Sequence, residues 1–364
     1  MSMSQTKANR LKEKAIKVLW ITFSWVIISH LLFFYENQVL STYECDPESY
    51  NFANLYITNL IVTIIAGIIG GSLIVQLMEN WLRNLPYLKA LAYIFISYTI
   101  VSLTVTIMGG LIFFSLELNK SMLSPDVLTV HWEYLLELKF LRSYFVWLFI
   151  VLGTLIVLMV NDKYGPGVFL DFLLGKYFKP RREERIFMFL DLRSSTTIAE
   201  KLGEEKYFGF IKDVFKDATP SILDSKGEIY QYVGDEIIIS WKMENGKKNA
   251  NCLRCFFDVQ HALIRKSDYY LEKYGVNPEF KAGLHYGFVM AGEVGIVKRD
   301  IAFSGDVLNT AARIQAKCND LDVNILFSKY LMDKLALPPH VFEFRKMGDM
   351  LLRGKNQTVV LYTA

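Results

Sequence analysis

Residues 186–196 read IFMFLDLRSST, in which five apolar residues precede an aspartate and a polar segment rich in hydroxyl groups. A short apolar run bounded by polar turn formers is typical of a buried β-strand. The pattern therefore predicts a strand over Ile186–Leu190. It also predicts that the carboxylate of Asp191 is exposed where this strand ends.

Downstream of this strand, helical and strand patterns alternate. An amphipathic stretch predicts a helix over Glu204–Leu223 that ends near Gly227. Gly234-Asp235, between two apolar stretches, predicts a tight hairpin turn. The other predicted elements are strands over 228–233 and 237–241, a helix over about 250–274, strands over 280–285 and 288–291, a helix over 307–318, and strands over 324–328 and 342–347. Residues 182–364 are thus expected to form an α+β domain.

The N-terminal half has a different composition. Residues 1–165 carry 22 of the 77 charged side chains of the 364-residue chain, and 52% of all residues are hydrophobic. This composition excludes a disordered, collagen-like or wholly soluble chain. A transmembrane helix needs about 20 mostly apolar residues. We predict four membrane-spanning helices, at Val18–Tyr35, Ser49–Met78, Ala90–Leu116 and Ser143–Asn161.

Basic residues near the ends of the spans predict their orientation. The tail over residues 1–17 has five Lys and Arg and one acid, whereas the loop after the first span has four acids and no base. We therefore expect a multi-pass protein of the inner or plasma membrane, in contact with lipid, whose tail and residues 162 onward are cytoplasmic. Residues 18–161 would form the membrane domain. The net formal charge of +3 is small, so no nucleic-acid partner is expected.

Residues 162–181 are predicted to link the two parts. Gly165-Pro166-Gly167 breaks the fourth helix, and the apolar-rich stretch Val168–Phe178 is a candidate transducer helix. Such a helix is placed to relay motion or to pair with its copy in a dimer. A passive linker is an equal alternative.

Two features that could suggest a metal site are better explained by packing. Cys252 and Cys255 form a C-x-x-C without a second pair nearby, and apolar residues surround them, so core packing is favoured over metal or redox chemistry. His30 is the one histidine within a predicted span. A single ligand does not make a haem or metal site, so a packed or hydrogen-bonded histidine is expected.

Asp191 and Asp235 are the candidate catalytic carboxylates. Each is predicted at the end of an apolar strand, where a turn exposes it. If the two strands are neighbours, the carboxylates converge and can bind Mg²⁺, which prefers oxygen ligands and can bridge to a nucleoside triphosphate. Asp is also common in turns, so either aspartate taken alone is better explained by turn structure.

A third segment, GDVLNTAARI at residues 305–314, places Asn309 and Arg313 four residues apart on one face of a predicted helix. An amide and a guanidinium on that face can bind ribose and phosphate. The structural alternative is that Arg313 pairs with Asp306 or Glu293.

Four segments together resemble the catalytic domain of the class III nucleotidyl cyclases. They are FLDLRSST at 189–196, YVGD at 232–235, GLHYG at 283–287 and GDVLNTAAR at 305–313. The resemblance covers about residues 182–364. It implies a ferredoxin-like α+β catalytic domain and a homodimer whose active sites are shared between the two chains.

The resemblance also implies roles for individual residues. Asp191 and Asp235, together with Leu192, would bind two Mg²⁺ or Mn²⁺ ions. Asn309 would orient the ribose, and Arg313 would stabilise the pentavalent transition state. One chain would supply the metal ligands, and its partner would supply Gln231, Asn309 and Arg313.

The implied nucleotide-binding residues are Thr196, Gln231, Ala302 and Arg353, and two of them depart from the family pattern. Adenylyl cyclases of the family usually have Lys at the position of Gln231 and Asp or Thr at that of Ala302, whereas guanylyl cyclases typically have Glu and Cys. Gln231 can donate and accept hydrogen bonds at a purine edge, but Ala302 offers only its backbone. Arg353 retains a cation where the family usually has a triphosphate-binding lysine.

The leading hypothesis is a membrane-bound adenylate cyclase that converts ATP to 3′,5′-cyclic AMP and pyrophosphate. The alternatives are a guanylate cyclase, and a membrane receptor with a catalytically inactive cyclase-like domain. Retention of both aspartates, Asn309 and Arg313 argues against the inactive domain. A diguanylate cyclase is a further alternative, because VGDEI at 233–237 faintly resembles its Gly-Gly-Asp-Glu-Phe turn, but the first glycine and the phenylalanine are missing.

Overall fold

The computed structural model describes residues 3–42, 52–80, 82, 85–136, 138–164, 171, 174–297, 299–335, 342–352 and 358–364. The chain divides into two compact units, Met1–Tyr164 and Gly165–Ala364.

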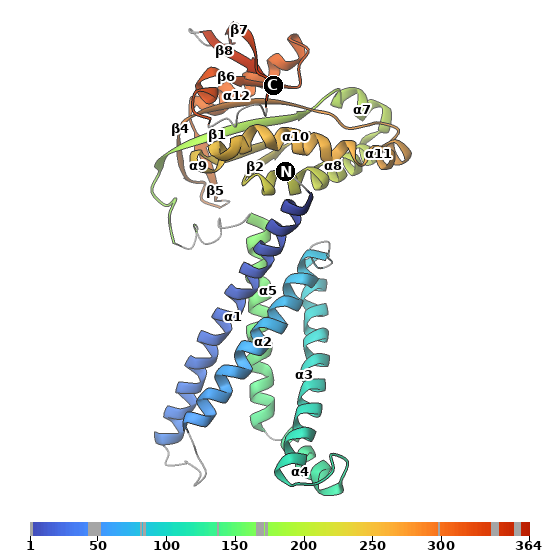
Figure 1. Cartoon of the computed structure of the whole chain (residues 1–364), viewed down its shortest axis with the longest axis vertical. Coiled ribbons are helices and arrows are strands. Elements are labelled where there is room, and N and C mark those ends of the chain that lie inside the picture. The colour runs from blue at the N-terminus through green and yellow to red at the C-terminus, as the bar shows by residue number, and fades with distance from the viewer. Residues whose placement is uncertain are drawn as a thin grey trace. The chain divides into compact units, whose positions relative to one another are not determined.

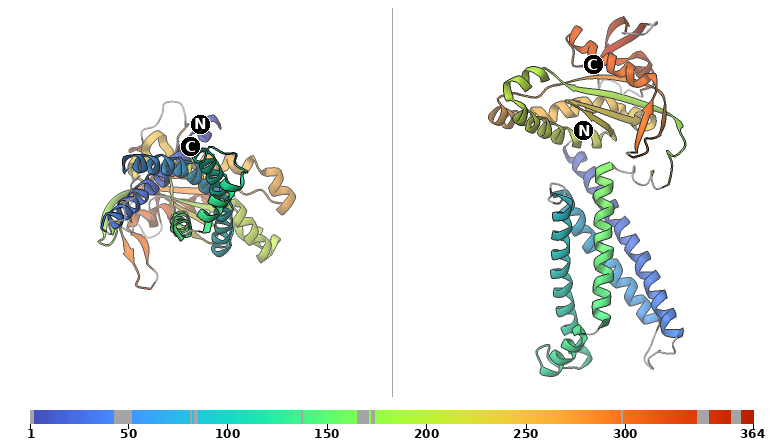
Figure 2. Two further views of the ribbon diagram at one scale, coloured as in Figure 1. Left: turned by 90° about the horizontal axis from the view of Figure 1, so that it is seen from below. Right: turned by 180° about the vertical axis from the view of Figure 1, so that it is seen from behind.

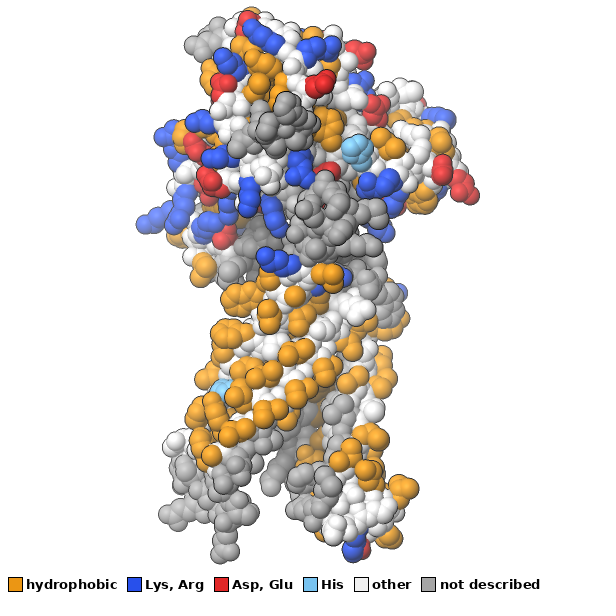
Figure 3. Space-filling model, viewed as in Figure 1, with side chains coloured by type: hydrophobic (Ala, Val, Ile, Leu, Met, Phe, Trp, Pro, Cys, Tyr) orange, Lys and Arg blue, Asp and Glu red, His pale blue; other side chains and the backbone are white. Residues whose placement is uncertain are grey.

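Five long or medium helices make up the described part of the first unit. They are α1 (Met3–Thr42), α2 (Phe52–Asn80), α3 (Tyr87–Glu117), α4 (Pro125–Leu136) and α5 (Leu138–Tyr164). Four contain stretches long and apolar enough to cross a membrane, at Lys14–Val39, Asn59–Met78, Tyr87–Ile112 and Phe140–Asp162. These agree with the four predicted spans. Figure 2 shows the long helices from two further sides, and in Figure 3 apolar side chains cover their described surface.

Glycines allow α1 and α2 to pack closely. A Cβ atom added at Gly67 would lie 2.8 Å from Thr22 Cγ2, and one added at Gly70 would lie 3.0 Å from the ring of Trp25. Larger residues at these positions would push the two helices apart, because interior packing leaves no spare volume. The glycines therefore serve packing within the unit.

Polar contacts also join the helices of this unit. His30 Nε2 lies 2.9 Å from the Tyr56 hydroxyl, and its Nδ1 lies 2.8 Å from the Val26 carbonyl, which confirms the expected hydrogen-bonded histidine. Arg142 Nη2 lies 3.0 Å from Glu36 Oε1. The last turns of α1 and the start of α5 are therefore on the same side of the unit.

The second unit is built on one mixed sheet with strand order β2-β3-β1-β4-β6-β8-β7, and β5 pairs with β4. The strands are β1 (Arg181–Leu192), β2 (Glu228–Val233), β3 (Glu236–Lys242), β4 (Phe280–Val294), β5 (Asp300–Ser304), β6 (Ile325–Ser328), β7 (Arg345–Leu351) and β8 (Thr358–Thr363). Among the described strands, β4 and β6 are the parallel pair and the other pairs are antiparallel. The domain is α+β, as expected. Its ferredoxin-like arrangement stays a prediction.

Helices pack on both faces of this sheet (Figure 1). They are α7 (Ser195–Leu202), α8 (Glu204–Asp224), α9 (Met243–Lys247), α10 (Asn251–Ile264), α11 (Ser267–Tyr274), α12 (Asp306–Asp320) and α13 (Lys329–Met332), with a 3₁₀ turn at Lys248–Ala250. Successive strand residues point to opposite faces. In β1, Ile186, Met188 and Leu190 therefore join the core under α8 and α10, while Phe187 and Phe189 join a second cluster with residues of α12.

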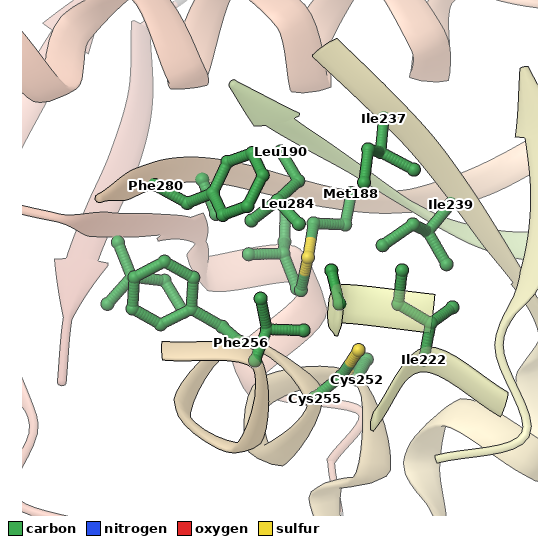
Figure 4. Close-up of a cluster of buried hydrophobic side chains, with 14 of the residues drawn as sticks. Met188, Leu190, Ile222, Ile237, Ile239, Cys252, Cys255, Phe256, Phe280 and Leu284 are labelled. Atoms are coloured by element: carbon green, nitrogen blue, oxygen red, sulfur yellow. The ribbon is translucent and has the colours of Figure 1, made fainter. Parts of the chain in front are cut away.

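The C-x-x-C pair lies in the first of these cores. Cys252 and Cys255 of α10 are fully buried beside Met188 and Phe256 (Figure 4). Burial raises the pKa of both thiols, so they remain protonated and unreactive. The prediction of core packing is confirmed.

Several element boundaries differ from those predicted. The helix over 250–274 is two helices, because the chain turns near Lys266 and directs the hydroxyls of Tyr270 and Tyr274 to Asp217 and Asp213 of α8, at 2.7 and 2.6 Å.

The strands expected over 280–285 and 288–291 are one continuous strand, β4. Gly287 does not form a turn there. A Cβ atom at this position would lie 2.7 Å from Val307 Cγ2, so the glycine provides room for α12.

Strands β5 and β8 were not predicted, and β7 begins at Arg345 rather than at residue 342. Of the candidate transducer helix, Val168–Phe178, residues 168–170, 172 and 173 lie outside the described residues, and residues 174–178 form turns.

Candidate active site

The two candidate carboxylates are placed by β1 and by the β2–β3 hairpin. Asp191 is the penultimate residue of β1, and Asp235 lies in the two-residue turn between Val233 and Glu236. Gly234 has a φ of 61°, which a tight hairpin turn of this kind requires. Because β1 pairs with β3, Asp191 lies opposite Glu236 and beside the turn that carries Asp235. The sheet therefore brings the two aspartates together.

Negative charge accumulates at this point. Burial raises the pKa of Asp191, Lys281 lowers it, and Asp235 raises it further. Burial, then Asp191 and Asp235, raise the pKa of Glu236 to about 7. Crowded carboxylates of this kind are stabilised by a nearby cation.

The donor set fits a hard divalent ion. Within the described residues, no group of three or more His, Cys, Asp and Glu side chains is arranged to enclose a metal ion. Mg²⁺ is typically held by one or two protein carboxylates, and substrate phosphates and water complete its shell. Asp191 and Asp235 match that requirement.

Two residues that the sequence did not predict as part of the site also contact Asp191. Lys281 of β4 is its direct neighbour in the sheet, and Lys281 Nζ lies 3.1 Å from Asp191 Oδ2. Gln315 of α12 donates a hydrogen bond from Nε2 to the same oxygen at 2.8 Å. These contacts fix the position of the carboxylate.

Gly283 allows α12 to lie close enough for that hydrogen bond. A Cβ atom at Gly283 would lie 2.2 Å from the backbone nitrogen of Gln315 and 2.5 Å from the carbonyl oxygen of Ala311. The helix backbone therefore rests directly on β4. The first glycine of the GLHYG segment at 283–287 has a packing role that supports the site.

Asn309 and Arg313 share one face of α12, as predicted, but this face is turned away from Asp191. Residues of an α-helix are spaced by about 100°. Arg313 and Gln315, two residues apart, therefore point in directions about 160° apart. Gln315 is buried against Asp191, whereas Asn309 is exposed and Arg313 is partly exposed. The structure does not bring Arg313 to the aspartates of its own chain.

The two purine-contacting positions lie on β2 and β5. A register shift between Ile229 and Gln231 pairs Gln231 with Ile238, and a shift of one residue exchanges the faces of a strand. Gln231 is thereby turned to the face of the sheet that carries Asp191, where it is exposed. Ala302 lies in β5, opposite Gly292 of β4.

Comparison with known proteins identifies the domain. Residues 179–363 match the family model described as the adenylate and guanylate cyclase catalytic domain. The chain belongs to this family.

Individual relatives of this cyclase include enzymes named for either nucleotide. Adenylate cyclase 2 of Rhizobium meliloti (strain 1021) is 34% identical over 205 residues, which are 56% of this chain and 56% of that protein. The receptor-type guanylate cyclase gcy-10 of Caenorhabditis elegans is 22% identical over 207 residues, 55% of this chain and 19% of that protein. The matched region is thus 56% of the length of the first relative and 19% of the length of the second.

A solved structure is also similar to the cyclase domain. The crystal structure of the adenylyl cyclase CyaB from P. aeruginosa has 18% sequence identity and a TM-score of 0.45, and it covers 50% of this chain and 94% of that chain.

The remaining predicted residues of the cyclase domain are placed as follows. Leu192 is buried at the end of β1, and its direct neighbour in the sheet is Phe280. Thr196 is exposed in the first turn of α7, just after the strand that carries Asp191. Arg353 lies outside the described residues.

Proposed function

We propose that the protein is a membrane-bound adenylate cyclase that converts ATP to 3′,5′-cyclic AMP and pyrophosphate. Membership of the cyclase family and the 34% identity to a protein named adenylate cyclase support this proposal. The observation that carries it is the convergence of Asp191 and Asp235 at one end of β1 and the β2–β3 turn.

Asp191 and Asp235, with Leu192 beside them, are the residues that would hold two Mg²⁺ or Mn²⁺ ions, the metals that cyclases of this class generally use. When bound, such ions lower the pKa of an attacking hydroxyl and neutralise charge on phosphates. Gln315 and Lys281 keep Asp191 in place for this role.

In the proposed reaction the ribose 3′-hydroxyl releases its proton to solvent and its oxygen forms a bond to the α-phosphorus, while the bond from that phosphorus to the pyrophosphate oxygen breaks. The guanidinium of Arg313 would stabilise the added charge on the α-phosphate. Asn309 would hold the ribose. Thr196 and Arg353 would contact the nucleotide, and Gln231 and the backbone at Ala302 would contact the purine.

We further propose that the working unit is a homodimer with two shared sites. The direction of Arg313, about 160° from the Gln315 side chain that contacts Asp191, supports this proposal. The metal ligands of one chain would then act together with Gln231, Asn309 and Arg313 of its partner. The nucleotide would lie between the chains.

The membrane part is proposed to span the lipid bilayer four times, with the N-terminal tail and the catalytic domain in the cytoplasm. The basic tail and the acidic first loop support this orientation. The ion pair between Glu36 and Arg142 supports the number of spans, because two spans between these residues bring the end of α1 and the start of α5 to the same side.

A guanylate cyclase is the second candidate, because gcy-10 is among the relatives and neither Gln231 nor Ala302 matches the usual adenylyl pair. Mass spectrometry of the products tests both candidates. The purified full-length protein would be incubated with ATP or GTP and with Mg²⁺ or Mn²⁺. Cyclic AMP as the main product is expected. Cyclic GMP as the only cyclic product would establish the second candidate, and no cyclic product would indicate an inactive domain.

A further inference from the structure

Arg185 of β1 is a buried charge that the proposed chemistry does not use. Its side chain is 1% exposed. Fully buried arginines are rare and destabilising unless their charge and their N–H groups are paired. The contacts of this guanidinium therefore indicate what it holds together.

The guanidinium has partners from five parts of the domain. Its Nε donates to Glu183 Oε2 at 2.8 Å, and its Nη1 donates to Glu228 Oε2 at 2.5 Å and to Ser240 Oγ at 3.1 Å. Its Nη2 donates to the Tyr177 hydroxyl at 3.4 Å, and its central carbon lies 4.5 Å from the centre of the Phe303 ring. Burial lowers the pKa of Arg185, but Glu228 and Glu183 raise it above its ordinary value, so the group remains charged.

Two of these partners belong to the strands that carry the purine-contacting positions. Glu228 is the first residue of β2, three residues before Gln231, and Phe303 follows Ala302 in β5. In the sheet, β2 pairs with β3 and β5 pairs with β4. Among the described strands, no backbone ladder joins β2 to β5.

Side-chain contacts join β2 directly to β5. The backbone N–H of Phe303 donates to the Tyr230 hydroxyl at 3.5 Å, and the Phe303 and Tyr230 rings are 5.0 Å apart. Arg185 joins the same two strands from the β1 side, through the Glu228 carboxylate and the Phe303 ring. The described sheet links β2 to β5 only through β3, β1 and β4, so these side-chain contacts are the direct link between the two strands.

We propose that Arg185 is a positioning residue for the base of the nucleotide, and that it sets the spacing between Gln231 and the backbone at Ala302. This inference rests on the proposed function, because it concerns the base of the same substrate. Ala302 presents only backbone groups to a purine, so recognition there depends on where β5 is held. A displacement of about 1 Å in a positioned group can cost on the order of 100-fold in rate.

The test compares Arg185→Met with a variant of its main partner and with a matched control. Arg185→Met keeps an extended, apolar side chain and removes the pairs to Glu228 and Glu183. Glu228→Gln removes the charge on β2 and keeps the shape of the side chain. The control is Asp217→Asn, which disturbs a buried hydrogen-bonded carboxylate on α8 that contacts Lys266 and Tyr270, on the other face of the sheet.

Two readouts are needed for each full-length variant. The first is kcat and KM for ATP and for GTP. The second is the affinity for each nucleotide, from competition against a fluorescent ATP analogue. We expect Arg185→Met to change the ratio of ATP to GTP affinity, and of the two kcat/KM values, by on the order of tenfold, mainly through KM. Glu228→Gln should shift both ratios in the same direction by a smaller factor. Asp217→Asn should leave both ratios within twofold of their wild-type values.

The proposal is overturned if folded Arg185→Met protein keeps both ratios within twofold of the wild type. It is also overturned if Asp217→Asn shifts them equally, since the effect would then be general loosening. If Arg185→Met does not fold, the proposal is tested with Glu228→Gln, and it is overturned if that variant keeps both ATP-to-GTP ratios within twofold of the wild type. If the wild type turns over neither nucleotide, the proposed function fails, and the affinity ratios still decide the role of Arg185.

Discussion

Gln315 donates a hydrogen bond from Nε2 to Asp191 Oδ2 at 2.8 Å and so joins α12 to the end of β1 across 124 positions of sequence. Arg313, two residues earlier on the same helix, points about 160° away from this contact. The helix face that supports the aspartate of a chain is therefore not the face that carries its arginine. This arrangement supports the proposal that Asp191 of one chain and Arg313 of its partner act on one nucleotide.

The first prediction concerns the metal ligands. Asp235→Asn should lower kcat by on the order of 10³-fold, since a bound metal ion contributes several kcal/mol to the transition state. Asn is well tolerated in turns, so the domain should stay folded. The matched control is Asp322→Asn, a turn aspartate with a φ of 48° and a 99% exposed side chain. Initial rates and thermal unfolding of both variants check this.

Chelation gives a second measurement of the same assignment. EDTA should abolish turnover, and added Mg²⁺ or Mn²⁺ should restore it in the wild type and in Asp322→Asn. Comparable turnover by Asp235→Asn and the wild type would remove Asp235 from the metal site.

The second prediction concerns the contact between β4 and α12. Gly283→Ala should destabilise the domain by about 1–3 kcal/mol or more, because the new Cβ overlaps the backbone of α12. Turnover should also fall at temperatures where the protein remains folded, since Gln315 would move from Asp191.

Gly209→Ala is the matched control for this variant. Gly209 lies within α8, and its added Cβ would meet only the Tyr274 hydroxyl, at 3.6 Å. Alanine favours the helix there, so equal or higher stability is expected. Thermal unfolding and initial rates are measured for both. If Gly283→Ala behaves like Gly209→Ala, the close approach of α12 does not matter for the site.

The third prediction concerns the choice of base. The wild type should prefer ATP, but less sharply than relatives with Lys and Asp at the positions of Gln231 and Ala302. A site without a designated hydrogen-bonding group rejects the wrong base poorly. The double variant Gln231→Lys/Ala302→Asp should raise the ratio of kcat/KM for ATP to that for GTP by about tenfold or more. A wild-type preference for GTP, or a double variant with an unchanged ratio, would contradict the base assignment.

Local sequence patterns were sufficient for much of the fold. The four apolar spans follow from length and composition, and Gly234-Asp235 forms the expected hairpin turn. Asp191 could be found because it ends an apolar strand. Asn309 and Arg313 share a helix face because their spacing of four residues matches the helical period.

The residues that surround Asp191 could not be found in the same way. Lys281 and Glu236 lie beside it only through the register of β1 with β4 and β3. Gln315 reaches it only because Gly283 lets α12 rest on β4. Register and close packing are properties of the assembled sheet, and no local periodicity encodes them.

The strand β5 and the purine positions illustrate the same limit. Residues 300–304 are too short and mixed to predict a strand, and they become one by pairing with β4. Gln231 faces the side of Asp191 because of a register shift in β2 that the alternation of its residues does not reveal.

The shared active site is tested most directly by combining two inactive chains. Asp191→Ala and Arg313→Ala should each be inactive alone. When the two are co-expressed, mixed dimers should collect both lesions in one site and leave the other intact. With random pairing about half of the dimers are mixed, so the account predicts recovery of about a quarter of wild-type cyclic AMP production. Activity no higher than that of either variant alone, in chains shown by pull-down to associate, would contradict it.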